Sequence, residues 1–160
     1  MNKPLNEYFF KEDLRLRSIG ESDIDLLVPI INDAYSYQNS AKGEPRTNPE
    51  HLRKRVTETN FYVLENDQEL MGCVYLEPKG KALHFGLLTL IPEYRKKGIA
   101  TEILNAIDQY AKDNGFNSID LDYMSLAPWL KSYYQRYGFA ETGKVINWGA
   151  IDLIRMTKKL

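Results

Sequence analysis

Residues 82–124 constrain the fold most, because they read as a strand, a helix and a second strand in direct succession. The segment "ALHFGLLTLI" (82–91) is a long apolar run that Pro92 ends, as expected of a central strand. From Ile99 onward, apolar side chains recur at helical spacing. The segment "SIDLDYM" (118–124) then alternates like a strand. This succession predicts one parallel βαβ crossover.

Further strands are expected on both sides of this unit. Five segments have the alternation or the composition of strands: 14–19, 61–65, 69–77, 139–145 and 152–160. The second and third of these are joined by the turn "NDQ" and form a hairpin. A chain of 160 residues suits one hydrophobic core. We therefore expect a single α/β domain, residues 1–160, with a mixed, mostly antiparallel sheet and helices on both faces.

Three more helices complete the expected order. One follows the acidic segment 21–23, and Pro29 within its apolar pattern predicts a kink or a break. A polar loop over 39–50 then leads into a second helix, which Thr47 or Asn48 caps. A short aromatic helix, "WLKSYYQRY", follows Pro128.

Composition argues against several classes of protein and site. The formal net charge is -1, so no overall basic field favours nucleic acid or an anionic membrane as a partner. Cys73 is the single cysteine, which excludes an internal disulfide framework and a cysteine-based zinc site. His51 and His84 are the only imidazoles, so we expect no metal. No apolar run approaches the ~20 residues of a membrane helix, and the first residues do not read as a signal peptide, so we expect a cytoplasmic protein.

The segment "PEYRKKGIA" (92–100) has the features of a diphosphate site. Three cations, Arg95, Lys96 and Lys97, precede Gly98 where the helix begins. A helix N-terminus offers unpaired N–H groups and partial positive charge, and glycine lets the backbone approach a phosphate closely. The alternative is a solvated basic loop. Walker and Gly-x-Gly-x-x-Gly patterns are absent, so nucleoside triphosphates and dinucleotides lack their usual signatures.

Two segments resemble the GNAT superfamily of N-acetyltransferases. "LLTLIPEYRKKGIATEIL" resembles its acetyl-CoA signature, Arg/Gln-x-x-Gly-x-Gly/Ala, through Arg95, Gly98 and Ala100. "YYQRYGF" (133–139) resembles the later Tyr-x-x-x-Gly-Phe segment, and the order of elements also matches. The resemblance implies a GNAT-type fold and an acyltransferase that uses acetyl-CoA.

The resemblance also implies where acetyl-CoA lies. The pyrophosphate and pantetheine arm are expected along seven residues: Arg95, Lys96, Lys97, Gly98, Ile99, Ala100 and Thr101. A bulge is expected near Gly86–Thr89, with Gly86 as a plausible bulge residue, so that the strand splays from its parallel neighbour. Leu88, Thr89 and Leu90 then line the cofactor, and the N–H groups of Leu88 and Leu90 face the thioester and pantetheine.

The resemblance implies a tyrosine as the general acid and leaves several candidates for the general base. Tyr134 aligns with the family tyrosine that donates to the leaving sulfur, with Tyr133 as the fallback and simple packing as the alternative. His84 shares a face with Leu88 unless the bulge shifts the register, and its imidazole suits a general base. Glu77 is a second candidate, water a third, and a structural histidine the alternative.

One position departs from the family pattern. Many relatives carry an asparagine, which contacts the cofactor arm, seven residues before the tyrosine. Here that position is Ala127, and Ser125 is the nearest polar substitute.

The acceptor site in this family forms from the first helices, the following loop and the ends of the last strands. Six residues supply it here: Asp33, Tyr35, Tyr37, Glu44, Arg46 and Trp148. Aromatic and acidic groups suit a small amine, whereas Arg46 suits the carboxylate of an amino acid or peptide end. The aromatic residues can instead simply pack over the core.

Three functions remain open. The first is an acetyltransferase for a small amine, and the second is the same enzyme acting on a protein or peptide amine. The third is a non-catalytic acyl-CoA-binding module. The tyrosine and the intact turn favour catalysis. A homodimer through the last strands is possible.

Overall fold

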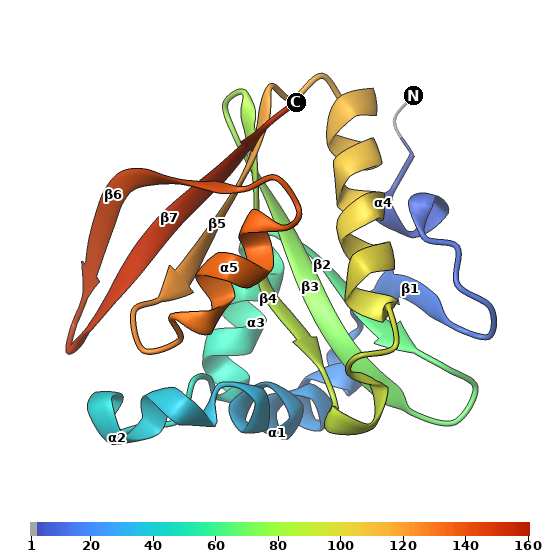
Figure 1. Cartoon of the computed structure of the whole chain (residues 1–160). Coiled ribbons are helices and arrows are strands. Elements are labelled where there is room, and N and C mark those ends of the chain that lie inside the picture. The colour runs from blue at the N-terminus through green and yellow to red at the C-terminus, as the bar shows by residue number, and fades with distance from the viewer. Residues whose placement is uncertain (1–2) are drawn as a thin grey trace.

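The computed structural model describes residues 3–160, which form one seven-stranded sheet flanked by helices (Figure 1). The strand order is β1-β2-β3-β4-β5-β7-β6. The strands are β1 (Arg15–Ser18), β2 (Asn60–Glu65), β3 (Leu70–Lys79), β4 (Ala82–Leu90), β5 (Ser118–Met124), β6 (Ala140–Trp148) and β7 (Ile151–Lys159). The helices are α1 (Ile24–Ala34), α2 (Asn39–Lys42), α3 (Pro49–Glu58), α4 (Ile99–Asp113) and α5 (Trp129–Gln135). The mixed α/β architecture with helices on both faces is confirmed.

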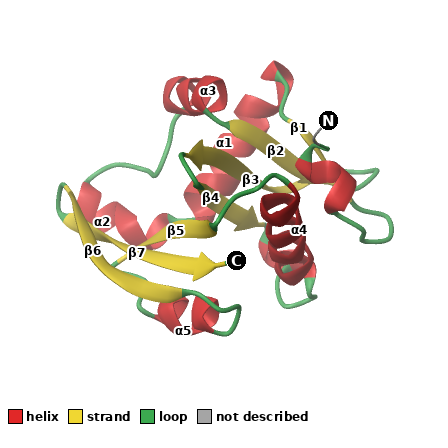
Figure 2. Cartoon of the chain, turned by 90° about the horizontal axis from the view of Figure 1, so that it is seen from above, coloured by secondary structure: helices red, strands yellow, loops and turns green. Residues whose placement is uncertain are grey.

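Helices cover the two faces of the sheet differently (Figure 2). The apolar stripe of α4 packs on one face, and α5 with its aromatic side chains lies on the same side. The helices α1 and α3 cover the other face over β2, β3 and the end of β4. Each helix buries one stripe and leaves its polar side in water, which is the arrangement that an amphipathic pattern predicts. None of the helices within residues 3–160 has the length and apolar character needed to cross a membrane.

The predicted crossover is present, and it is open at one end. The β4 and β5 strands are the one parallel pair, and they pair only from Ala82 to His84 on the β4 side. Beyond His84 the two strands diverge, and α5 lies at the opening (Figure 1). The strands therefore splay as the family resemblance implied, and backbone groups of β4 past the divergence have no strand partner on that edge.

A bulge in β4 accompanies this divergence, but Gly86 is not the bulged residue. Gly86 pairs with Tyr75, and Thr89 pairs with Cys73, so two residues of β4 face one of β3 between these pairs. Leu87, one of those two, has a φ of 51°. Gly86 is needed for another reason: a Cβ there would lie 2.4 Å from the Tyr75 hydroxyl, because the ring of Tyr75 crosses over the glycine.

Two local expectations differ from the structure. The α1 helix continues through Pro29, so the break, one of the two expected outcomes, is absent. The proline removes only the N–H that would bond the Asp25 carbonyl, and both residues are exposed, so water can satisfy that carbonyl. The expected loop over 39–50 begins with the short helix α2, which Gly43 ends at a φ of 73°. Asn48, one of the two candidate caps, accepts a hydrogen bond from the His51 N–H at 2.9 Å.

Candidate functional site

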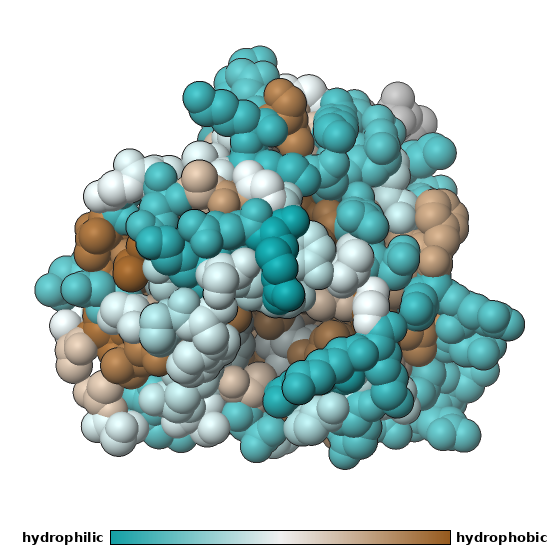
Figure 3. Space-filling view, viewed as in Figure 1, coloured by the Kyte–Doolittle hydropathy of each residue, from teal (hydrophilic) through white to brown (hydrophobic). Residues whose placement is uncertain are grey.

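Two cavities meet in the opening between β4 and β5. The first, here called the turn cavity, has a volume of about 520 Å³ and reaches the segment 95–100. The second, the strand cavity, has a volume of about 340 Å³ and runs along β4 and β5 to the end of β6. In the space-filling view, hydrophobic residues lie within a hollow at the centre of the molecule, with hydrophilic ones around it (Figure 3). The two cavities share Tyr35, Tyr37, Leu88, Leu130 and Tyr134.

The turn before α4 presents free backbone amides. The first intrahelical bond runs from the Glu102 N–H to the Gly98 carbonyl at 3.1 Å, so the amides of residues 98–101 have no intrahelical partner. No side chain caps this end of the helix. Gly98 has a φ of 80°, and a Cβ placed on it would have no atom within 4 Å. The backbone is therefore open to a ligand at the place where a diphosphate was expected.

The side chains of the same segment have different surroundings. Arg95 donates from Nε to the Leu90 carbonyl at 2.9 Å, and Arg95, Lys96 and Ala100 line the turn cavity. The Lys97 ammonium lies 5.6 Å from the centre of the Tyr94 ring. Two residues point elsewhere: Ile99 is buried in the core, and the Thr101 hydroxyl lies 2.6 Å from that of Tyr137. For Ile99 and Thr101, only the amides remain as groups for a diphosphate.

Strand β4 directs two further amides toward the opening. The Ile91 N–H donates to the Met71 carbonyl at 2.8 Å, so it points toward β3. Because successive N–H groups of a strand alternate in direction, those of Leu90 and Leu88 point to the opposite edge. At that edge β5 has already diverged. Leu88, Thr89 and Leu90 all line the turn cavity.

Tyr134 lies where the two cavities meet. Its ring is buried and makes edge contacts with Tyr133, Phe139 and Phe85, at centroid distances of 5.1, 5.9 and 6.1 Å. Burial raises the pKa of Tyr134 well above its usual value, so the hydroxyl stays protonated at neutral pH. Its hydroxyl has no hydrogen bond to any residue between 3 and 160, which leaves it available to a ligand.

His84 lies on the strand cavity, on the opposite face of β4 from Leu88. The bulge at residues 87–88 shifts the alternation, so Leu88 packs toward α4 while His84 stands beside Tyr75. The shared face was expected only if the bulge left the register unchanged, and the bulge does shift the register. His84 is buried, its Nδ1 has no hydrogen-bond partner in the described chain, and burial lowers the pKa of the imidazole. The carboxylate of Glu77, the other candidate base, lines the same cavity and lies 3.5 Å from Lys79 Nζ.

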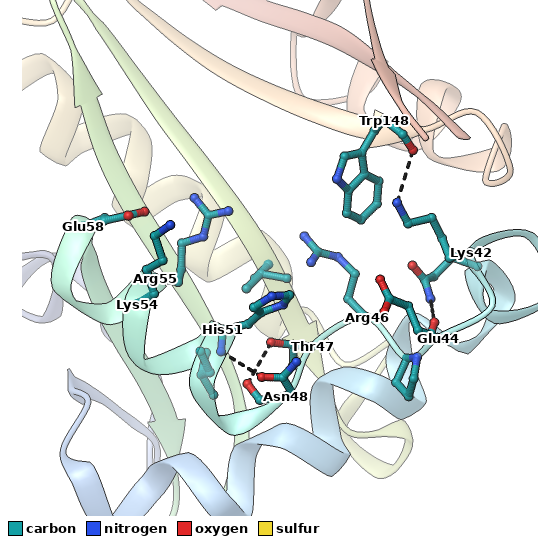
Figure 4. Close-up of a pocket in the computed structure, with 14 residues that line it drawn as sticks. Lys42, Glu44, Arg46, Thr47, Asn48, His51, Lys54, Arg55, Glu58 and Trp148 are labelled. Carbon is teal, nitrogen blue, oxygen red and sulfur yellow. Dashed lines mark hydrogen bonds between the residues drawn. The ribbon is translucent and has the colours of Figure 1, made fainter. Parts of the chain in front are cut away.

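Of the expected acceptor residues, Tyr35, Tyr37, Arg46 and Trp148 line the strand cavity. Glu44 borders a third cavity of about 390 Å³ beside α3, here called the α3 cavity (Figure 4). Asp33 instead borders a separate surface hollow near Glu93, so it does not belong to the acceptor site.

Ser125 does not replace the family asparagine at the cofactor. Its hydroxyl accepts a hydrogen bond from the Asp152 amide at 3.3 Å, and it lines neither the turn cavity nor the strand cavity. Ala127 at the asparagine position is fully buried.

The sequence analysis missed Arg55 and Tyr75, which both line the strand cavity. The Arg55 guanidinium lies 5.0 Å from the centre of the Tyr75 ring. Helical phase was the signal that could have found Arg55, because it follows the buried Leu52 by three residues and so lies on the inner side of α3.

Comparisons with known proteins identify the family to which this fold belongs. The model of the acetyltransferase (GNAT) domain matches residues 31–160. Human N-acetyltransferase 8 is 29% identical over 90 residues, which cover 52% of this chain and 40% of that protein, so the match spans less than half of the relative.

Two solved structures have the same fold at low identity. The PaiA N-acetyltransferase of Thermoplasma acidophilum in complex with coenzyme A superposes with a TM-score of 0.71, at 17% identity, over 92% of this chain and 99% of that one. The spermidine N-acetyltransferase of Vibrio cholerae in complex with CoA and spermine gives 0.69, at 22% identity, over 93% and 96%. Because the domain model matches residues 31–160, which is most of this chain, the chain belongs to the GNAT family of acetyltransferases.

Proposed function

We propose that the protein transfers the acetyl group of acetyl-CoA to the primary amine of a small molecule, by direct attack within a ternary complex. The observation that carries this proposal is the meeting of two cavities at Tyr134. Acetyl-CoA entering along the turn cavity and an amine entering along the strand cavity reach the same point from two sides. Direct transfer requires such an arrangement, because both reactants must be bound at once.

The residues of the turn cavity suit acetyl-CoA. The free amides of residues 98–101 suit the diphosphate, and the apolar lining from Leu88 to Tyr133 suits the pantetheine arm. Acetyl-CoA supplies an acetyl group that is activated as a thioester. The N–H groups of Leu88 and Leu90 would donate to carbonyl oxygens along this arm and stabilise negative charge on the thioester oxygen.

In the transfer, the amine nitrogen forms a bond to the acetyl carbon, and the bond from that carbon to sulfur breaks. Tyr134 stabilises the leaving thiolate with its hydroxyl. A phenol of reference pKa ~10 is a weaker acid than a thiol of ~8.5, and burial weakens it further, so complete proton transfer from Tyr134 is uphill. We therefore assign Tyr134 a hydrogen bond to the developing thiolate. CoA leaves as the thiolate and takes its proton from solvent.

The proton that the amine releases goes to His84 or Glu77, directly or through water. Both groups line the strand cavity, from which the amine would enter. His84 is the stronger candidate, because its lowered pKa keeps the imidazole neutral at pH 7 and its Nδ1 is unsatisfied within residues 3–160.

A small acceptor suits the strand cavity better than a protein chain does. The Lys42 ammonium lies 3.8 Å from the centre of the Trp148 ring and donates to the Trp148 carbonyl at 3.3 Å. This contact joins α2 to the turn between β6 and β7 across the acceptor side of the site (Figure 4). The relative from Vibrio cholerae is named for a small amine. A protein or peptide amine is the alternative, and we propose the cytoplasm as the place of action.

The first test measures binding and turnover together. Acetyl-CoA at 100 times its Kd is expected to stabilise the protein by about 2.7 kcal/mol, which a thermal-shift experiment detects. Release of free CoA thiol with a panel of small amines is then expected, and peptides with a free N-terminus should release less. An unchanged melting temperature with acetyl-CoA would count against the whole proposal, and faster release with peptides would favour the alternative acceptor.

The second test follows the pH dependence of His84. Because burial lowers the pKa of this imidazole, kcat/KM is expected to rise with pH through a value below ~6.5 and then to level off. The unprotonated form is the base, so activity is lost as pH falls and the ring takes a proton. His84→Ala should lower kcat and remove this acidic limb. A variant profile identical to that of the unaltered protein would exclude His84, and a limb that disappears only in Glu77→Gln would assign the base to Glu77.

A further inference from the structure

Two arginine side chains on the acceptor side of the site, Arg46 and Arg55, have no carboxylate partner. Both line the strand cavity and the α3 cavity. Their guanidinium groups are directed into the space between α3 and the indole of Trp148 (Figure 4). Among residues 3–160, no carboxylate oxygen lies within 4.0 Å of either group.

Of the other arginines in the described chain, Arg95 and Arg136 also lack a carboxylate within 4.0 Å, but neither lines the strand cavity. Arg53, two residues before Arg55 on the same helix, lies on its outer side and donates from Nε to Glu21 at 2.7 Å. Arg17 pairs with Asp23 through two hydrogen bonds of 2.7 and 2.8 Å. Arg155 also lines the strand cavity, but it is paired with Asp122. Within residues 3–160, Arg46 and Arg55 are therefore the arginines of this cavity whose charge no carboxylate offsets.

The surroundings of Arg46 leave one of its donors unsatisfied. Its Cζ lies 5.0 Å from the centre of the Trp148 ring and 5.6 Å from that of Tyr35. Its Nε is buried and has no hydrogen-bond partner in the described chain. Aromatic faces attract the charge, but they do not accept N–H bonds as an oxyanion does. A buried N–H donor without an acceptor is costly, and an oxyanion in the cavity would satisfy it.

The acidic side chains nearby do not supply that partner. In the strand cavity, Glu77 lies 3.5 Å from Lys79, and Asp122 accepts two hydrogen bonds from Arg155, at 2.8 and 3.0 Å. Glu44 and Glu58 border only the α3 cavity, and both are exposed. The strand cavity therefore keeps two positive charges that no protein carboxylate neutralises.

We propose that the acceptor is a small amine that also carries a carboxylate, and that Arg46 and Arg55 bind this carboxylate while its amine lies near Tyr134. The inference rests on the proposed acetyltransferase function and names its substrate class. Guanidinium groups recognise carboxylates through paired N–H bonds. The cavity between the arginines and Tyr134 has aromatic walls, which include Tyr75 and Trp148. An amino acid with an apolar or aromatic side chain meets these features, whereas a polyamine would bring like charges beside two cations.

Matched pairs of amines test this substrate class. L-phenylalanine is compared with 2-phenylethylamine, and L-tryptophan with tryptamine, by thiol release from acetyl-CoA. Each pair differs only by the carboxylate. We expect kcat/KM to be at least about tenfold higher for the amino acid in each pair, since a charge-assisted hydrogen-bonded pair contributes at least this factor.

Three arginine-to-methionine variants and one lysine variant show which side chains bind the carboxylate. Arg46→Met and Arg55→Met are each expected to raise KM for the amino acid about tenfold or more, with kcat and the KM of the matched amine changed little. Arg46→Lys keeps the charge but not the paired geometry, and should recover only part of the loss. Arg53→Met, on the outer side of α3, is the control and should change neither KM.

The outcomes separate this inference from the proposed function. If the amines without a carboxylate are the better substrates, or if Arg53→Met and Arg55→Met act alike, the carboxylate site is wrong and the acetyltransferase stands. If no amine releases thiol and acetyl-CoA does not bind, the proposed function itself fails. If turnover is too slow to measure, binding of the products tests the same inference. The complex of the protein with CoA is titrated with N-acetyl-L-phenylalanine and with N-acetyl-2-phenylethylamine. Tighter binding of the acid, lost in Arg46→Met, supports the carboxylate site, and equal binding overturns it.

Discussion

Gly98→Val is expected to abolish measurable binding of acetyl-CoA, with a loss in affinity of about 100-fold or more. A Cβ placed on Gly98 would have no atom within 4 Å, and we expect the valine side chain to keep a diphosphate away from the free amides of residues 98–101. A diphosphate that no longer reaches these amides loses at least two charge-assisted hydrogen bonds, each of ~1.5 kcal/mol or more, which together amount to that factor. Isothermal titration calorimetry with acetyl-CoA measures the loss.

The cations beside Gly98 are expected to matter less. Lys96 and Lys97 are exposed, and exposed charges contribute ~1 kcal/mol at most, so Lys96→Ala or Lys97→Ala should weaken binding by up to about fivefold. The larger effect is assigned to the backbone. If either lysine variant loses more affinity than Gly98→Val, the side chains hold the diphosphate and this assignment is wrong.

Gly115→Val is the matched control for backbone strain. Valine at a φ of about 80° is strained wherever it stands, and Gly115 at the other end of α4 has a φ of 78° with no atom within 4 Å of its Cβ position. Both valine variants should therefore lose similar amounts of thermal stability. Only Gly98→Val should lose acetyl-CoA affinity, and equal losses from the two would show that the effect reflects instability of α4.

The crossover and the turn before α4 could be predicted because their signals are local. A long apolar strand, Pro92 and a helix of regular period require no knowledge of distant contacts. Asn48 could likewise be named as one of two possible caps, since a cap depends on the residues immediately after it.

The bulge shows where such reasoning ends. Its position near residues 86–89 was implied by a family pattern, yet Gly86 is not the bulged residue and is required instead by Tyr75, which is eleven positions earlier in the chain. The ring of Tyr75 occupies the space that a side chain at position 86 would need, so a contact between two strands requires glycine there. The same bulge moved Leu88 to the other face from His84, which no alternation rule predicts.

The acceptor side was the least predictable part, because it is assembled from distant segments. Arg46, Arg55 and Trp148 come from a loop, a helix and a late strand. Arg53 and Arg55 look alike in the sequence, and only the phase of α3 separates the one that is paired with Glu21 from the one that faces the cavity. A charged residue in the sequence points to a binding site here only when its ion-pair partner, or the absence of one, is known.

Tyr134→Phe is expected to lower kcat by about 100-fold, the lower end of what one preorganised hydrogen-bond donor to a developing negative charge contributes, while the Kd for acetyl-CoA stays almost unchanged. The substitution removes only the hydroxyl, and phenylalanine keeps the edge contacts with Phe85, Phe139 and Tyr133. Because the hydroxyl has no protein partner within residues 3–160, stability should change little. Thiol release under saturating substrates measures kcat, and calorimetry measures Kd.

Tyr133→Phe is the matched control, and pH provides a second criterion. The centre of the Tyr133 ring lies 5.1 Å from that of the Tyr134 ring, and Tyr133 also lines the turn cavity. Unlike Tyr134, it does not line the strand cavity. It should keep kcat near that of the unaltered protein, and a large loss in Tyr133→Phe alone would move the role to that residue. Since burial raises the pKa of Tyr134 well above its usual value, its hydroxyl remains a donor through alkaline pH. An alkaline loss of kcat below pH ~10 that Tyr134→Phe removes would contradict this assignment.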